Sequence, residues 1–157
     1  MQNARRADPA AAIGKQVGNY ISKNFAPNSV IATNSAGAVA YFAPDHYFID
    51  MLGLNDRTIG KRDDFPIRTH WQQFPGHSKG DGKYVLSRHP NYIILGPAEG
   101  TVANTANEKK VNVVWFLSDQ EIAEAPAFVS NYQLKTVPLS NTLIFNYYER
   151  KQAATHP

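Results

Sequence analysis

Residues 76–82 (GHSKGDG) place an imidazole, an ammonium group and a carboxylate between three glycines. Glycine allows a backbone to approach a ligand closely. His77 and Asp81 are residue types that bind divalent metals, and His46 or His70 would add a further ligand. The alternative is a solvated loop in which Asp81 caps the helix that follows. Both interpretations use the same residue types, so the segment predicts either a metal-dependent site or a helix cap.

Polar residues also follow two short apolar runs, residues 29–33 and 47–50, which predict β-strands. If the two strands are parallel neighbours, Asn34, Ser35 and Asp50 converge at their carboxyl ends, where open α/β sheets bind ligands. This arrangement predicts a small polar ligand site. The alternative is that Asp50 only caps the turn after its strand.

Two tryptophans have different predicted environments. Trp71 lies in a polar stretch beside the glycine-rich segment, together with Phe74, and an exposed indole face stacks well on a sugar ring. The alternative for Trp71 is a loop anchor. Trp115 lies in an apolar run and is predicted to be in the core.

Composition excludes several classes of protein. Cysteine is absent, which removes disulfides, thiolate catalysis and cysteine-based metal clusters. Phosphate-binding glycine motifs and a G-x-S-x-G elbow do not occur. The formal net charge is +3, and the cations are scattered in isolated pairs, so no nucleic-acid partner is predicted. No apolar run approaches the ~20 residues that a membrane-spanning helix needs.

The elements that position these residues predict a single-domain α/β sandwich, with a mixed sheet flanked by helices. Asp8 and Pro9 predict the start of a helix, and residues 132–137 and 143–148 predict a C-terminal β-hairpin. Ser118 is predicted as a helix N-cap. Residues 61–82 and 98–110 are expected to be loops. The predicted domain covers residues 9–149, between a flexible N-terminal segment (1–8) and a flexible tail (150–157).

Several of these segments together carry a family resemblance. Residues 37–42 (GAVAYF), 48–56 (FIDMLGLND) and 75–94 (PGHSKGDGKYVLSRHPNYII) follow one another in order. This pattern resembles the C-terminal soluble domains of bacterial GT-C-type polytopic membrane glycosyltransferases, particularly the arabinofuranosyltransferase-like and mannosyltransferase-like members. The resemblance covers residues 13–96 and, more loosely, the closing hairpin, and Asn91 stands where the family more often has aspartate.

The resemblance implies an extracytoplasmic domain on the periplasmic side of the bacterial inner membrane. Its partners would be the transmembrane part of the same parent chain, the membrane surface, and a glycan acceptor or lipid-linked sugar. Arg5 and Arg6 would lie just after the last transmembrane helix. In such proteins the catalytic residues lie elsewhere in the parent chain, so no catalytic residue, cofactor or metal is predicted here. The candidate binding residues are Asn34, Ser35, Asp50, Asp56, Trp71, His77, Lys79 and Asp81.

The leading hypothesis is therefore a non-catalytic accessory domain that helps to bind or orient the glycan acceptor in cell-envelope glycan synthesis. Two alternatives stay open. One is a stand-alone carbohydrate-active or metal-dependent enzyme that uses residues 76–81. The other is a carbohydrate-binding module in which Trp71 stacks on a sugar ring.

Overall fold

The computed structural model describes residues 8–35, 37–104 and 114–152. Arg5 and Arg6, which were predicted to follow a transmembrane helix, lie outside these ranges. So do residues 1–7 and 153–157, which were predicted to be flexible. The elements are α1 (Pro9–Asn24), β1 (Val30–Thr33), α2 (Ala38–Tyr41), β2 (Tyr47–Asp50), α3 (Arg57–Gly60), the 3₁₀ helix η1 (His70–Gln73), α4 (Gly82–Ser87), β3 (Tyr92–Ile94), the 3₁₀ helix η2 (Ala98–Gly100), β4 (Thr101–Ala103), α5 (Leu117–Glu124), α6 (Pro126–Asn131), β5 (Tyr132–Ser140) and β6 (Leu143–Arg150).

The predicted class is confirmed: helices cover a mixed six-stranded sheet, and β5 and β6 form a C-terminal hairpin. The strand order is β2-β1-β3-β6-β4. Strand β5 lies off this path and pairs with β6. Strands β2, β1 and β3 are parallel, and β6 runs antiparallel to β3. The carboxyl ends of β2, β1 and β3 therefore share one edge of the sheet, which we call the carboxyl edge; the opposite one is the amino edge.

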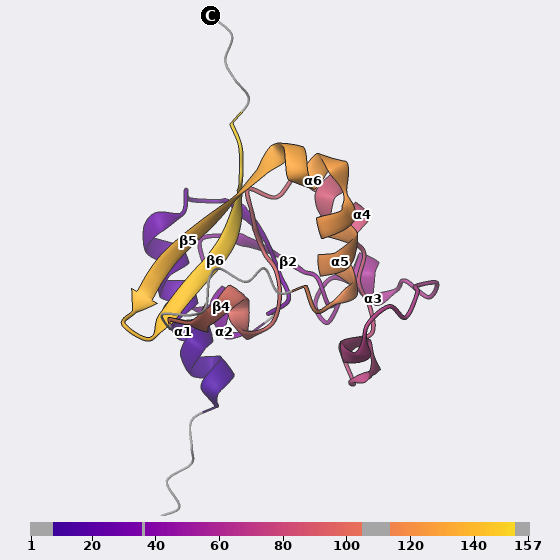
Figure 1. Cartoon of the computed structure of the whole chain (residues 1–157), viewed down its shortest axis with the longest axis horizontal. Helices are drawn as coiled ribbons and strands as arrows, with labels where there is room; N and C mark the ends of the chain where they lie inside the picture. The colour runs from indigo at the N-terminus through magenta and orange to yellow at the C-terminus, as the bar shows by residue number, and fades with distance from the viewer. Residues whose placement is uncertain (1–7, 36, 105–113, 153–157) are drawn as a thin grey trace, which may run out of the picture.

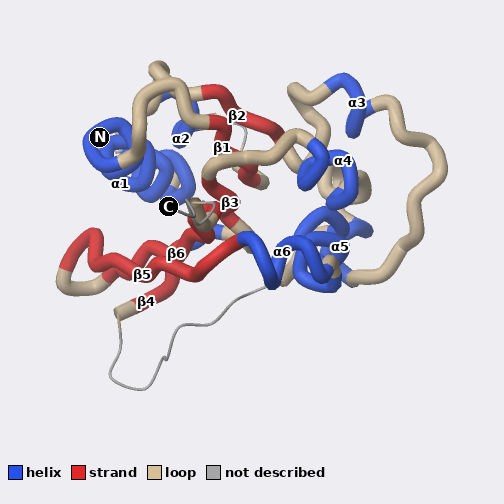
Figure 2. The backbone as a smooth tube through the Cα atoms, turned by 90° about the horizontal axis from the view of Figure 1, so that it is seen from above, coloured by secondary structure: helices blue, strands red, loops and turns tan. Residues whose placement is uncertain are grey.

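Side chains from both faces of the sheet form separate cores, because successive residues of a strand point in opposite directions. On one face, Ile31 of β1 packs with Val17 of α1 and Val39 of α2. On the other face, the next residue, Ala32, packs with Val85 of α4 and Ile122 of α5. Figure 2 shows α1 and α2 on one side of the sheet and α3 to α6 grouped on the other.

The first helix begins where the sequence predicts. Asp8 is its N-cap and accepts a hydrogen bond from the Ala10 N–H at 3.0 Å, and Pro9 occupies the first turn. In Figure 1, α1 starts at the bottom of the view and β6 ends at the top. The two described ends of the chain therefore lie at opposite edges of the sheet. No helix in the described ranges is both long and apolar enough to cross a membrane.

Four local predictions differ from the structure. Four elements, η1, η2, β4 and α6, lie where loops or no element were expected, since segments of three to six residues give weak periodicity. The hairpin strands extend beyond the predicted ends, and Pro138 lies inside β5 at a bulge. The predicted N-cap at Ser118 is wrong, because α5 begins at Leu117 and its N-cap residue is Phe116. Trp115 is half-buried and outside the core clusters.

Candidate functional site

The candidate site lies at the carboxyl edge, between β1 and β3. From β1 the chain reaches β2 through α2 on one face, and from β2 it reaches β3 through α3 and α4 on the other. Right-handed crossovers on opposite faces separate the loops that follow β1 and β3. Open α/β sheets bind ligands at this kind of switch point, outside the carboxyl ends of the strands.

Four polar side chains meet at the switch point. Asn34 follows β1 and is buried, with Nδ2 donating to Asp119 Oδ1 at 2.7 Å and a longer contact to the Gly96 carbonyl at 3.5 Å. Ser35, the next residue, donates its hydroxyl to Glu99 Oε1 at 3.2 Å. The structure therefore brings the two predicted residues Asn34 and Ser35 together with two carboxylates from distant parts of the chain.

Two acceptor atoms at this point have no hydrogen-bond partner among the described residues. They are Asn34 Oδ1 and Glu99 Oε2, and both side chains are only 9% exposed. An unpaired buried polar atom costs roughly 1–3 kcal/mol, so such atoms are rare in folded proteins. Both atoms accept hydrogen bonds, which makes a hydroxyl group the natural complement.

The segment that carries Glu99 has an unusual backbone. Ala98 and Glu99 have φ angles of 53° and 55°, and Gly96 and Gly100 at 81° and 73° flank them. Glycine adopts this left-handed region readily, but alanine and glutamate do so at a cost of about 1–2 kcal/mol each. Strained non-glycine residues concentrate at functional sites, where the surrounding structure holds them in place.

Asp119 supports the switch point from the first turn of α5. Its Oδ1 accepts from Asn34, and its Oδ2 accepts from the backbone N–H groups of Gly96, Trp115 and Phe116 at 3.1, 3.1 and 3.2 Å. The side chain is fully buried. Burial raises the pKa of Asp119, and the hydrogen bonds oppose that shift. One carboxylate thus ties the end of β1, the end of β3 and the start of α5 together.

The predicted carboxylates Asp50, Asp56 and Asp81 serve as caps. Asp50 accepts the N–H groups of Leu52 and Asn55 at 3.0 and 2.6 Å, as its structural alternative predicted. Asp56 caps α3 and also accepts the hydroxyl of Tyr84 at 3.2 Å. Asp81 caps α4 by accepting the Tyr84 N–H at 2.8 Å, which again matches the structural alternative. All three carboxylates are engaged by backbone donors.

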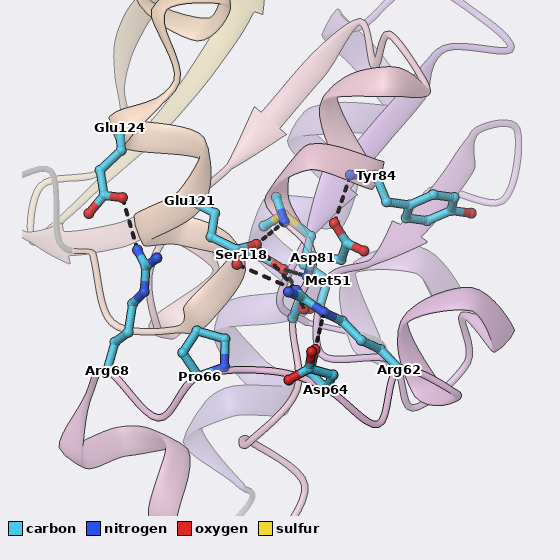
Figure 3. A network of polar contacts seen from close by, with 12 residues as sticks. Met51, Arg62, Asp64, Pro66, Arg68, Asp81, Tyr84, Ser118, Glu121 and Glu124 are labelled. Atoms are coloured by element: carbon cyan, nitrogen blue, oxygen red, sulfur yellow. Dashed lines mark hydrogen bonds and ion pairs between the residues drawn. The ribbon is translucent and has the colours of Figure 1, made fainter.

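The long loop that precedes α4 is fastened to α5, as Figure 3 shows. Arg62 donates to the Gly80 carbonyl at 2.5 Å and pairs with Glu121 at 3.4 Å. The Gly82 N–H donates to the same Glu121 carboxylate at 2.6 Å. Farther along the loop, Arg68 pairs with Glu124 at 2.9 Å. These contacts fix the loop as part of the α3–α6 layer.

A single hydroxyl joins the glycine-rich segment (residues 76–82) to the end of β2. Ser118 accepts the Asp81 N–H at 2.9 Å and donates to the carbonyl of Met51, the residue after Asp50, at 3.0 Å. Inside α5 its hydroxyl bonds to tertiary partners instead of capping its own helix, contrary to the prediction. The glycine-rich segment and the end of β2 are therefore rigidly connected, although they lie far apart in the sequence (Figure 3).

The other three predicted residues lie along the loop and form no described hydrogen bond with the switch-point side chains. Lys79 donates to the Gly60 carbonyl and lies 4.0 Å from Asp63. His77 stacks on Phe116 with ring centroids 5.4 Å apart.

Trp71 is half-buried, and its indole lies flat on Trp115 at 3.7 Å, with an angle of 10° between the planes. Trp115 therefore covers one face of the ring that the sugar-stacking hypothesis uses. The contact also explains why Trp115 is half-buried: it anchors the loop at the surface.

The predicted metal set of His77, Asp81 and a second histidine is not assembled. Within the described ranges, no three His, Cys, Asp or Glu side chains lie close enough to share an ion. His77 Nδ1 lies 2.9 Å from the Pro75 carbonyl, and the Asp81 carboxylate caps α4. His46, another proposed ligand, lies in the turn before β2, and burial lowers its pKa.

Sequence reasoning missed Glu99 and Asp119. Asp119 left a usable signal, because an acidic residue in the first turn of a helix commonly accepts the N–H of the cap residue. Glu99 left none, since its role depends on a left-handed turn and on Ser35, which is 64 residues away.

Glu99 predicts a pH effect on stability. Burial raises the pKa of Glu99 above the ordinary value of 4.5, the negative charge of Asp8 adds to this, and the Ser35 hydrogen bond opposes it. The unfolded chain therefore releases this proton at lower pH than the folded chain does. Ionisation of Glu99 consequently reduces stability as pH rises from its unfolded pKa to its folded pKa.

Glu99→Gln should remove the loss of stability that ionisation of Glu99 causes. The variant is expected to gain stability relative to the wild type at about pH 8, and the gain should shrink towards about pH 4. Urea unfolding midpoints at several pH values measure both effects, with Asp64→Asn, which changes an exposed carboxylate, as the control. A difference between variant and wild type that does not change with pH would contradict the assignment.

Comparison with known proteins gives one match. The family described as "Domain of unknown function (DUF8728)" matches residues 2–149. No curated protein and no solved structure matches the chain.

Proposed function

This chain belongs to the DUF8728 family, and we propose that it is an extracytoplasmic accessory domain of a membrane glycosyltransferase that uses a lipid-phosphate sugar donor. In this role it binds or orients the glycan acceptor for cell-envelope glycan synthesis. The chemistry is carried out by the transmembrane part of the same parent chain. The carboxyl edge, with the switch point between β1 and β3, is the face that meets the acceptor.

One observation carries the proposal: the chain enters the fold at the carboxyl edge. Asp8, the cap of α1, is close enough to Glu99 for its charge to raise the pKa of that carboxyl, and α1 contacts η2. A transmembrane segment preceding this helix would hold the switch point against the membrane surface. That is where a lipid-linked donor and a glycan acceptor have to meet.

The chemistry of the switch point suits an acceptor sugar. Asn34 Oδ1 and Glu99 Oε2 are hydrogen-bond acceptors, and Ser35 adds a half-buried hydroxyl between them. Sugar hydroxyls donate to such acceptors, and amide, carboxyl and hydroxyl side chains supply the orientation.

A positioning role also agrees with the state of the motif carboxylates. Asp50, Asp56 and Asp81 accept backbone N–H groups, which uses their lone pairs for structure. A general acid or base must instead be within reach of the proton that it transfers. The motif residues therefore support a rigid scaffold around the edge, which supports a non-catalytic role.

Kinetics of the full-length parent protein test this function. Ser35→Ala removes one hydroxyl at the switch point, and one hydrogen bond is worth about 0.5–1.5 kcal/mol. We expect the KM for the acceptor to rise about two- to tenfold, while kcat and the KM for the lipid-phosphate donor stay within twofold. Ser87→Ala, an exposed serine of α4, is the matched control.

Two outcomes would overturn the proposal. One is a parent coding region with no apolar segments of about 20 residues beyond this domain. The other is a fall in kcat for Ser35→Ala at an unchanged acceptor KM, because this would place the residue in the chemical step.

A further inference from the structure

A concave site lies at the amino edge, opposite the switch point. It is a cavity of about 1080 Å³ where four segments meet: the α1–β1 turn, the α4–β3 turn, the α6–β5 junction and the end of β6. Its polar lining includes His89, Asn91, Asn131, Arg150 and Lys151. None of the residues named for the acceptor site lines it, so the two sites are separate.

Two consecutive cations hold the walls of this cavity. Arg150 donates its own N–H to the Asn91 carbonyl and its Nη1 to the His89 carbonyl, each at 2.9 Å, which fixes the α4–β3 turn. Lys151 donates its Nζ to the Ser130 carbonyl at 2.8 Å, at the carboxyl end of α6. Both side chains are exposed, and each keeps N–H donors beyond these bonds.

The positive charge of the pair is not neutralised within the described residues. Arg150 and Lys151 bond to backbone carbonyls, and neither forms an ion pair there. The nearby carboxylate of Glu149 is engaged elsewhere, by Lys135 at 3.4 Å and by Gln133 at 3.4 Å. The cavity therefore has a local excess of positive charge.

The remaining polar lining presents donors. Asn91 accepts the Val30 N–H through its Oδ1 at 2.9 Å, which leaves its Nδ2 as a hydrogen-bond donor. Asn131 and Gln152 contribute further amides. Clustered amide donors beside two cations are the chemistry that recognises phosphate oxygens.

The backbone around the cavity is also held in an uncommon conformation. His89 has a φ of 49°, and its carbonyl is the acceptor for Arg150. A non-glycine residue in this region is strained, and such residues persist where the surrounding structure determines them.

We propose that the amino-edge cavity binds the phosphate group of a phosphorylated ligand, with Arg150, Lys151 and the amide of Asn91 as its phosphate contacts. The volume exceeds that of a phosphate ion and is large enough for a body of sugar size attached to it. The proposal does not depend on the acceptor site, because no residue is shared.

Amide NMR titration of the whole chain tests the site with three probes: inorganic phosphate, glucose 1-phosphate and glucose. Both phosphate probes should shift amides around Asn131 and residues 150–152, and glucose should shift none of them. Lys151→Gln should weaken phosphate binding about tenfold, through loss of one charge-assisted bond. Lys15→Gln, an exposed lysine of α1, should leave it within twofold.

A gain of binding makes the test independent of folding damage. Glu149→Gln removes the one carboxylate among the described residues that line the cavity, and it should tighten phosphate binding. The proposal is wrong if glucose binds as well as glucose 1-phosphate, or if Lys151→Gln and Lys15→Gln behave alike. Binding of the chain to vesicles with and without phosphatidylglycerol identifies the source of the phosphate. If the chain binds phosphatidylglycerol vesicles and Lys151→Gln abolishes that binding, the ligand is a lipid phosphate. If the chain does not bind the vesicles, the ligand is a soluble phosphate.

Discussion

Replacing Asp119 with alanine is expected to lower the free energy of unfolding by about 3–5 kcal/mol, since it breaks a fully buried polar network. The substitution removes the Asp119 acceptor from four donors: the Asn34 amide, which keeps only its longer contact to the Gly96 carbonyl, and the N–H groups of Gly96, Trp115 and Phe116. These donors belong to the ends of β1 and β3 and to the start of α5. The switch point should therefore loosen together with the fold.

Urea unfolding followed by circular dichroism measures the effect of Asp119→Ala. Asp63→Ala is the matched control, because that carboxylate is almost fully exposed, and it should leave the midpoint unchanged. Asp119→Asn should cost much less than alanine. The Oδ1 of the asparagine can accept the three backbone N–H groups. Its Nδ2 faces the Asn34 amide, which must flip so that its Oδ1, the atom without a partner among the described residues of the wild type, accepts the hydrogen bond.

This comparison separates hydrogen bonding from packing. If asparagine and alanine destabilise the chain equally, the carboxylate does not act through its acceptor atoms. A loss below about 1 kcal/mol for alanine would show that the donors find other partners, and the proposed support of the switch point would be wrong.

Gly82→Ala is expected to destabilise the chain by about 3 kcal/mol through overpacking. A Cβ at this position would lie 2.5 Å from the Cβ of Glu121 and 2.8 Å from the Ile122 nitrogen. The second atom belongs to the backbone of α5, so a side-chain rotation does not relieve the clash. Alanine is the better helix former by about 1 kcal/mol, but that gain is smaller than the expected strain.

The same substitution should detach the loop from α5. The Gly82 N–H and Arg62 both bond to Glu121, so a displaced α4 start breaks both contacts. Thermal unfolding gives the stability change, and protease cleavage within residues 61–80 reports the released loop.

Lys83→Ala is the matched control. Lys83 follows Gly82 in α4, and its side chain is exposed. The substitution should leave stability and cleavage close to wild type. Equal effects at Gly82 and Lys83 would show that the close approach of α4 and α5 does not limit packing.

The local patterns of the sequence predicted those parts of the fold that depend on near neighbours. The Asp8–Pro9 start of α1, the strands β1 and β2 and the C-terminal hairpin follow from capping and periodicity over a few residues. Short elements such as β4 were missed, because three residues contain too little pattern.

For the candidate site, the sequence alone determined which polar residues end β1 and β2, and it offered caps as one of two interpretations of Asp50 and Asp81, which the structure confirmed. Only the tertiary structure decided which of them meet. The partners of Ser35 and Asn34, Glu99 and Asp119, lie 64 and 85 residues away, and strand pairing with helix packing brings them together. A hydrogen bond requires a distance near 3 Å, which short-range sequence patterns do not encode.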